Sequence, residues 1–335
     1  MVILLRNGLQ KWSGLAGAFV LMLLCMAASV LFGIKQIPFH TIIEAYTSFN
    51  GSNEHLIITT TRVPRAFIAA AVGASLAMAG ALMQALTRNP LASPTLFGIN
   101  SGAAFALVLV SALSSLTSLA QITWVSFIGA GAASIIVYAL GSAGRDGLTP
   151  IKITLAGAAL TAFFSSMTSG VLLVNGKTFD QVLSWLVGSV ANRDLSTLLA
   201  VLPYLIAAWI GALIIAGPVN LMAMGDDVAK GLGQRTLLVK IVLSVIVVIL
   251  AGGAVAIAGP IGFVGIMIPH LARALVGNDH RWLLPFCGLL GAVLLLGADV
   301  GSRFLMYGKE VPVGAVTAII GVPFFVVIAR RKNNE

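Results

Sequence analysis

Charged residues are what this sequence has least of. Only 9% of its 335 residues are Asp, Glu, Lys or Arg, while 59% are hydrophobic, and a soluble domain usually carries about 25% charged residues. The mean hydropathy is +1.02. So few polar side chains cannot cover the apolar surface of a water-soluble protein, whereas a lipid bilayer removes that requirement. The composition therefore excludes an ordinary soluble protein and indicates an integral membrane protein.

Residues suited to catalysis or metal binding are scarce as well. The two cysteines, Cys25 and Cys287, lie inside apolar segments and indicate no disulfide framework, and the four histidines show no metal-ligand spacing. The sequence contains no phosphate-binding loop, zinc-binding helix motif or nucleophile elbow. We therefore expect no catalytic residue, no metal site and no cofactor.

The net charge of +9 does not indicate nucleic-acid binding. The Lys and Arg residues lie between apolar segments, where basic residues act as topology signals. A nucleic-acid-binding surface needs a basic stripe or a polar domain, and the sequence has neither. Nucleic acid is therefore not an expected partner, while the lipid bilayer is.

Ten apolar segments follow one another along the chain. Each must be helical, because lipid offers no hydrogen-bonding partner to open backbone groups. Glycine is abundant, at 36 residues, and in lipid such small residues let helices pack closely. We predict an all-α polytopic membrane protein of about ten transmembrane helices, forming one transmembrane domain over residues 1–335. The predicted spans lie near residues 13–34, 64–86, 96–116, 121–141, 153–174, 197–217, 238–258, 260–276, 283–305 and 311–329.

The first apolar segment, 13–34, could also belong to a cleavable signal peptide. Its length exceeds the roughly 7–15 residues of a signal-peptide core, and further spans follow it. We expect it to remain as the first transmembrane helix.

Basic residues and span number together predict the topology. Lys and Arg are more numerous in the loops on the side of the N-terminus, so the positive-inside rule places both termini in the cytoplasm. Ten spans divide into two halves of five, and an odd number would invert the second half relative to the first. Asn89-Pro90 and Gly259-Pro260 interrupt the two halves in corresponding regions. We therefore expect inverted five-helix repeats.

Three connections are long enough to carry features of their own. Residues 35–63 and 175–196 are expected outside the membrane, and 179–190 could form a short helix on its surface. Residues 218–237 are expected inside, as the sizeable polar segment of the cytoplasmic face.

The inner connection contains a predicted short helix with defined ends. Asp226 and Asp227 suit the positive end of a helix dipole, and Gly233 can end the helix in a left-handed conformation. Such a capped helix could act as a lever for a soluble partner. The alternative is a loop that only joins two spans, and spacing alone leaves both interpretations open.

Two arginines flank Pro64 at the predicted outer start of the second span. Arg62 and Arg65 could be membrane-interface anchors. A helix dipole disfavours arginine at a helix N-terminus, however, so acidic groups on a partner would explain the pair better. Guanidinium groups bind carboxylates in a fork.

Asp299 is the acidic residue placed well inside a predicted span. It stands four residues before Arg303, a spacing at which helical side chains can pair. An intramembrane charge suggests function. The alternative is a pair that neutralises itself near the membrane boundary, in which case Asp299→Asn should have little effect.

Six further residues are predicted to shape turns. Asn89, Pro90 and Pro94 should form an inner turn between spans two and three, because proline disfavours a continued helix. Gly259, Pro260 and Pro269 should interrupt the chain around span eight. The alternative for the inner turn is a tight turn without a partner.

Taken together, the motifs resemble the FecCD family of ABC permeases, which serve iron–siderophores, haem and cobalamin. The resemblance runs from about residue 35 to residue 330. Its markers are Arg62-Val63-Pro64-Arg65, the stretch 80–94, Gly98-Ile99-Asn100-Ser101-Gly102-Ala103, residues 225–233, the stretch 259–265, Ile268-Pro269-His270, Asp279-His280-Arg281, Leu283-Leu284-Pro285, Ala298-Asp299 and Val311-Pro312-Val313-Gly314.

The resemblance implies a permease in a bacterial cell membrane that carries an iron–siderophore complex, with haem or cobalamin as alternative cargo. It implies four kinds of partner: a second, identical or homologous permease subunit, two cytoplasmic ATPase subunits, an extracytoplasmic binding protein and lipid. It also implies that the segment from Gly225 to Gly233, including Ala229 and Leu232, couples to the ATPase. Arg62, Arg65 and Arg303 would dock the binding protein.

Two other functions remain open at this point. An ion-coupled secondary transporter usually places ionisable groups near mid-membrane, whereas Asp299 lies near one end of its span. A non-transporting scaffold or receptor would neither bind an ATPase nor cause an uptake defect on deletion.

Overall fold

The chain has the predicted all-α fold. The structure is a computed structural model that describes residues 3–33, 37–114, 118–143, 149–306 and 310–332, and these residues contain no extended β-strand. Its helices are α1 (Gly8–Leu31), α2 (Phe39–Thr47), α3 (Asn53–Leu56), the π-helical turn η1 (Ile57–Arg62), α4 (Val63–Thr87), the 3-10 turn η2 (Pro94–Phe97), α5 (Ile99–Leu113), α6 (Leu119–Ser142), α7 (Pro150–Val174), α8 (Gly176–Leu186), α9 (Leu195–Ala223), α10 (Asp226–Gly231), α11 (Thr236–Ala258), α12 (Val264–Val276), α13 (His280–Ser302) and α14 (Val313–Lys332).

Each of the ten predicted spans overlaps one of these helices. Among the described residues, seven helices are long and apolar enough to cross a membrane, while the apolar helices at 99–113, 264–276 and 313–326 are shorter. The predicted span 260–276 begins later than expected, at Val264, because the chain is not helical from Gly259 to Phe263. The hydrophobic segments therefore predicted the helices and their order, while the first and last residues of the helices differ from those of the predicted spans.

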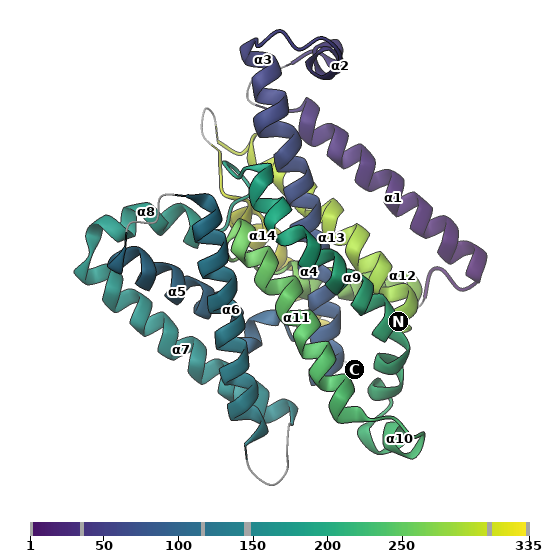
Figure 1. Cartoon of the computed structure of the whole chain (residues 1–335). Coiled ribbons are helices and arrows are strands. Elements are labelled where there is room, and N and C mark those ends of the chain that lie inside the picture. Colours follow the sequence, from purple (N-terminus) through teal and green to yellow (C-terminus); the bar gives the residue numbers. More distant parts are fainter. Residues whose placement is uncertain (1–2, 34–36, 115–117, 144–148, 307–309, 333–335) are drawn as a thin grey trace.

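The connections also contain helices. The helix expected at 179–190 is present as α8, shifted toward the N-terminus, and its position on the membrane surface stays a prediction. The connection 35–63 folds into α2 and α3, which lead through η1 directly into α4 and project beyond the helix bundle at the top of Figure 1.

The centre of the fold is α4, which packs against α9, α11, α12 and α13. Two glycines allow this close packing. A Cβ atom on Gly73 would lie 2.3 Å from the carbonyl oxygen of Gly291 in α13, and one on Gly80 would lie 2.0 Å from that of Gly265 in α12. These distances are too short for any side chain, so both crossings require glycine.

The two halves of the chain repeat one pattern of helix pairs. In the first half α4 is followed by α5, α6 and α7; in the second α11 is followed by α12, α13 and α14. The helix α4 packs on α12 and α13, while α11 packs on α5 and α6, so each half contributes one long helix to the other. The non-helical breaks after α4 and after α11 also correspond. The inverted five-helix repeat itself stays a prediction.

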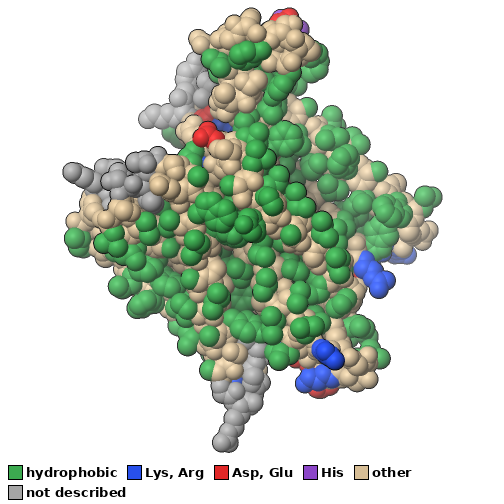
Figure 2. Space-filling view, viewed as in Figure 1, with side chains coloured by type: hydrophobic (Ala, Val, Ile, Leu, Met, Phe, Trp, Pro, Cys, Tyr) green, Lys and Arg blue, Asp and Glu red, His purple; other side chains and the backbone are tan. Residues whose placement is uncertain are grey.

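Hydrophobic side chains dominate the visible face of the molecule, and few charged side chains interrupt them (Figure 2). The first helix is an example, since only 11% of its apolar window is buried inside the chain. Apolar side chains exposed on this scale need lipid around them. The chain is a multi-pass membrane protein.

Candidate functional site

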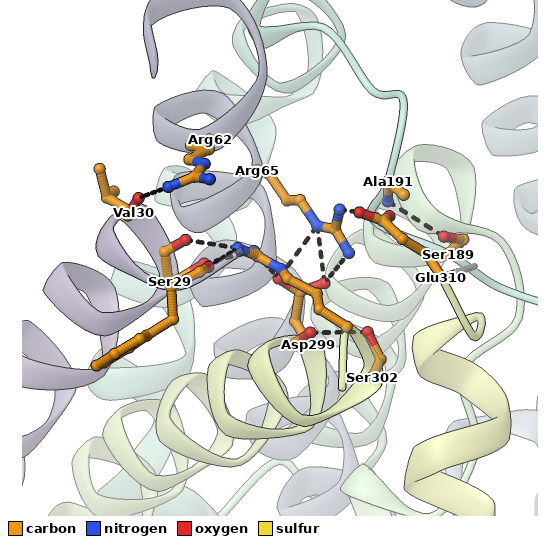
Figure 3. A network of polar contacts seen from close by, with 11 residues as sticks. Ser29, Val30, Arg62, Arg65, Ser189, Ala191, Asp299, Ser302 and Glu310 are labelled. Carbon is orange, nitrogen blue, oxygen red and sulfur yellow. Dashed lines mark hydrogen bonds and ion pairs between the residues drawn. The ribbon is translucent and has the colours of Figure 1, made fainter. Parts of the chain in front are cut away.

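Five ionisable residues meet at the end of the bundle where α1 ends and α4 begins. We call Arg62, Arg65, Asp299, Arg303 and Glu310 the outer charge cluster, after the side of the membrane on which the sequence analysis expects them. They come from η1, the first turn of α4, the end of α13 and the segment before α14. Figure 3 shows Arg65 pointing between Asp299 and Glu310, with Arg62 beside Val30 of α1.

Asp299 binds two arginines. The Nε atom of Arg65 lies 2.9 Å from Oδ1 of Asp299, and Nη2 lies 2.7 Å from the same oxygen. Nη2 of Arg303 lies 2.5 Å from Oδ2. The predicted i,i+4 pair is therefore present, and the second arginine is a contact that the sequence analysis missed. Asp299 is fully buried, and burying a carboxylate is costly unless it is paired and hydrogen-bonded as it is here.

Arg62 and Arg303 cap the C-terminal end of α1. Nη1 of Arg62 donates to the carbonyl oxygens of Val30 and Leu31, at 2.8 and 2.9 Å. Nη1 of Arg303 donates to those of Ser29 and Phe32, at 2.7 and 2.6 Å. The last carbonyl groups of a helix lack partners within it and carry partial negative charge. The two arginines supply both the hydrogen bonds and the compensating charge.

Glu310 completes the cluster at its more exposed edge. Its Oε2 atom lies 2.7 Å from Nη1 of Arg65, and its side chain is 35% exposed. A pocket of about 190 Å³ opens here, lined by Gly33, Ile57, Thr61, Arg62, Arg65, Arg303 and Glu310. Three guanidinium groups face two carboxylates in the cluster, and such an excess of positive charge suits an incoming carboxylate.

Burial changes the interpretation of the three arginines. Arg62, Arg65 and Arg303 are each only 5% exposed, so they are not free surface anchors. Their docking role stays a prediction. What the geometry establishes is a structural role, because they join α1, α4 and α13.

A second candidate region lies at the opposite end of α4, around α10. The predicted short helix is present at Asp226–Gly231. It ends as expected, since Gly233 has φ +80°, its N–H donates to Lys230 O at 2.9 Å, and the N–H of Gln234 donates to Ala229 O at 2.9 Å. These two bonds are those of a Schellman cap.

Asp226 anchors α10 to the bundle, which the sequence did not indicate. Its Oδ1 lies 2.6 Å from Nη2 of Arg88, just after α4, and its Oδ2 lies 2.6 Å from Nζ of Lys240 in α11. Burial disfavours the charged carboxylate, but the hydrogen bond and charge of Lys240 and the charges of Arg88 and Lys230 outweigh it and lower the pKa of Asp226. Asp226 is therefore ionised at neutral pH and fixes α10 to two helices.

The faces of α10 differ sharply. Ala229 is fully buried, whereas Met224, Val228 and Leu232 are 67%, 46% and 64% exposed. Val228 and Leu232 are four residues apart at α10 and its C-cap, so they share one side, whereas Met224 precedes the helix and is separated from it by the non-helical Gly225. The sequence analysis did not single out the exposed Met224 and Val228. Asp227 is exposed, and Gly225 adopts φ +126° immediately before the helix.

The inner turn forms as predicted. Arg88 ends α4 in a left-handed conformation with φ +50°. Oδ1 of Asn89 accepts a hydrogen bond from the N–H of Leu91 at 3.0 Å, and Pro94 occupies the first position of η2. The turn places Arg88 within reach of Asp226.

The break after α11 is also present, but one of its predicted residues is not part of it. Gly259 has φ +72°, and a Cβ atom there would lie 2.1 Å from the carbonyl oxygen of Trp185, so Gly259 and Pro260 allow α8 to pack closely. Pro269 was predicted to interrupt the chain, and this is wrong: it lies inside α12. Membrane helices tolerate an internal proline because neighbouring groups satisfy the freed backbone carbonyl.

Known proteins share this architecture over nearly its whole length. A model described as the FecCD transport family matches residues 21–331. The "Probable siderophore transport system permease protein YfiZ" of Bacillus subtilis (strain 168) is 54% identical over 326 residues, which cover 97% of this chain and 98% of that protein. The "Ferric enterobactin transport system permease protein FepD" of Escherichia coli (strain K12) is 41% identical over 317 residues, covering 95% of each. A solved structure described as a metal-chelate type ABC transporter in an inward-facing conformation matches with a TM-score of 0.83 and 27% identity, over 96% of this chain and 99% of that one.

Proposed function

The chain belongs to the FecCD transport family, and from that premise we propose that it is the permease subunit through which an ATP-driven importer carries an iron–siderophore complex. The observation that carries this proposal is the continuous similarity to a siderophore permease over 97% of the chain. ATP hydrolysis would take place on separate cytoplasmic subunits, and a second permease, identical or homologous, would complete the path. The permease would lie in a bacterial cell membrane, with both of its termini in the cytoplasm.

The exposed face of α10 supports the proposed contact with an ATPase. Met224, Val228 and Leu232 expose apolar surface beyond the end of the bundle, where a soluble partner would bury it. Asp226 ties that helix to Arg88 and Lys240. A displacement of α10 by the ATPase would therefore be passed to α4 and α11 rather than lost in a flexible loop.

The outer charge cluster supports the proposed contact with a binding protein. Its pocket is lined by three arginines at the end of the bundle opposite α10. A glutamate or aspartate of the binding protein entering this pocket would meet an excess of positive charge. Because the guanidinium groups are already held by α1 and Asp299, little side-chain entropy would be lost on docking.

Transport by the assembled system in vesicles tests the proposal. The permease, its ATPase and its binding protein are reconstituted, and uptake of iron-55 bound to a siderophore is measured against haem and cobalamin. We expect uptake of the siderophore that depends on ATP and on the binding protein.

Two results would contradict the proposal. Uptake that persists without ATP but stops when the proton gradient is dissipated would indicate a secondary transporter. If the system took up haem or cobalamin but none of the siderophores tested, the permease role would stand, but the proposed siderophore cargo would be wrong.

A further inference from the structure

A narrow apolar groove of about 570 Å³ runs between α1 and α9 over the surface of α4 and α13. Small residues of α4 and α13, including Ala70, Ala74 and Gly288, are among those that line it. On α1 it extends from Leu15 to Met26, which are eleven positions apart, or about 16 Å at 1.5 Å per residue. The hydrocarbon core of a bilayer is about 30 Å thick, so the groove spans about one leaflet.

One end of this groove carries positive charge on each side. Lys11 precedes Leu15 by one helical turn on α1, and Arg281 precedes the groove residue Pro285 by one turn on α13. Arg281 also reaches toward α9, since a Cβ atom on Gly217 would lie 3.5 Å from its Nη2 atom. The two basic residues therefore stand where the groove meets the membrane surface.

Two tryptophans mark the same end. Nζ of Lys11 lies 5.7 Å from the centre of the Trp282 ring, and Trp12 packs edge-on against Trp282 with ring centres 5.2 Å apart. Tryptophan is enriched where lipid headgroups meet the hydrocarbon core. The apolar groove thus begins at headgroup level.

The nearby carboxylate of Asp279 does not cancel the basic pair. Burial disfavours its charge, but the backbone N–H of Arg281, the Asn220 amide and the charges of Arg281 and Lys11 outweigh burial and lower the pKa of Asp279. One of its oxygens accepts both the Asn220 amide, at 2.6 Å, and the Arg281 N–H, at 3.0 Å. One negative charge therefore faces two positive side chains, and an anionic group is still favoured here.

We propose that this groove is a binding site for an anionic phospholipid, with one acyl chain between α1 and α9 and the phosphate between Lys11 and Arg281. The assignment to the cytoplasmic leaflet rests on the topology of the proposed function. The site itself rests on the apolar groove, its length of one leaflet, and the basic pair and two tryptophans at this end.

Native mass spectrometry of the assembled transporter tests this site. The complex is purified in mild detergent, and phosphatidylglycerol and phosphatidylethanolamine bound to the permease are counted after equal addition of each. We expect the wild type to retain phosphatidylglycerol preferentially. The double variant Lys11→Gln/Arg281→Gln, which keeps side chains of polar character and reasonable length, should reduce that preference about tenfold or more, since each basic residue contributes to binding of anionic lipid.

Two further variants separate this site from general charge effects. Lys152→Gln/Arg235→Gln removes the same charge at the starts of α7 and α11, away from the groove, and should leave the lipid preference unchanged. Ala74→Leu fills the groove and should lower retention of both lipids.

Equal retention of the two lipids by the wild type would overturn the site, as would a preference lost equally in both double variants. Loss of the partner permease in Ala74→Leu with lipid retention unchanged would show that a protein surface, and not a lipid, covers the groove. The assay measures lipid and not uptake, so its failure leaves the proposed transport function standing. A complex that retains lipid but imports no iron chelate would support the lipid site and contradict the proposed transport function.

Discussion

Asp299 is the residue on which the outer end of the bundle depends. It is fully buried and binds Arg65 and Arg303, and Arg303 in turn binds carbonyl groups of α1. Removing one partner of a buried ion pair leaves an uncompensated charge, which costs more than the pair itself contributes. Because of these contacts, we expect Asp299→Asn to have a larger effect than it would if Asp299 and Arg303 only neutralised each other near the membrane boundary.

We expect Asp299→Asn to destabilise the protein by about 3–5 kcal/mol, the usual cost of breaking a buried pair. The measurement is thermal unfolding of the purified protein in detergent. Glu310→Gln is the matched control, because Glu310 binds the same Arg65 but is 35% exposed, and it should cost about 1 kcal/mol or less. Similar melting temperatures for the two variants would show that Asp299 is not the central partner.

Glu310 also offers a test of docking that leaves the arginines in place. Glu310→Gln makes the pocket more positive, so an acidic group of the binding protein should bind a few-fold more tightly at low salt, with the gain lost at high salt. Titration calorimetry of the two proteins measures this. Unchanged affinity at low salt would exclude the pocket as the docking site. Reversing Arg62 or Arg65 would be less informative, because both also hold the bundle together.

Sequence spacing predicted one contact of Asp299 and missed the other for a physical reason. Arg303 is one helical turn away, so periodicity reveals it. Arg65 is separated by 234 residues and comes close only when α4 packs on α13. The same holds for Asp226, whose partners Arg88 and Lys240 belong to different helices. The sequence showed that these residues are charged and could form ion pairs, but which residues pair depends on how the helices pack.

Among the helices, α4 depends on glycine at its crossings. Gly80→Ala would place a Cβ atom 2.0 Å from the carbonyl oxygen of Gly265, and a backbone group cannot move aside as a side chain does. We expect destabilisation of about 1–3 kcal/mol or more, measured by thermal unfolding in detergent. Gly17→Ala on α1 is the control, since no atom lies within 4 Å of its Cβ position. Equal melting temperatures would show that α4 and α12 can separate without cost.

The exposed face of α10 can be tested apart from its anchor. Val228→Asp/Leu232→Asp should lower binding of the ATPase at least tenfold, because burying a charge in an apolar contact is unfavourable, while the melting temperature of the permease should not change. Co-purification of the ATPase with the permease measures assembly. Tyr46→Asp/Phe49→Asp alters equally exposed residues of α2 and the loop after it, at the other end of the molecule, and should leave assembly intact. Normal ATPase binding by the α10 variant would remove this face from the proposed interface.

Helices were more predictable than their ends. Long apolar segments require helices in lipid, so the order of the spans followed from the sequence. Proline was less informative: Pro90 and Pro260 lie at breaks, whereas Pro269 lies inside α12. The distinction depends on whether neighbouring groups satisfy the backbone, and a single segment does not contain that information.

Across the whole molecule, α4 connects the two candidate regions. It begins beside the outer charge cluster and ends at Arg88, which binds Asp226 at the start of α10. It also packs on helices from both halves of the chain. A single buried helix therefore runs from the proposed docking surface to the proposed coupling helix, and it can transmit movement between them only as a rigid body. This arrangement has meaning for transport only if its two ends face opposite sides of the membrane.

Cysteine labelling tests that requirement directly. In a background with Cys25 and Cys287 replaced by Ala, single cysteines are introduced at Gly51, in the exposed loop between α2 and α3, and at Lys230 on α10. A membrane-impermeant maleimide applied to intact spheroplasts should label position 51 only, and it should label position 230 after permeabilisation, because the excess of Lys and Arg holds that side in the cytoplasm. Labelling of position 230 in intact spheroplasts would show that the topology is the reverse of the predicted one. The helix α10 would then lie beyond the reach of a cytoplasmic ATPase, and the basic end of the lipid groove would lie in the outer leaflet.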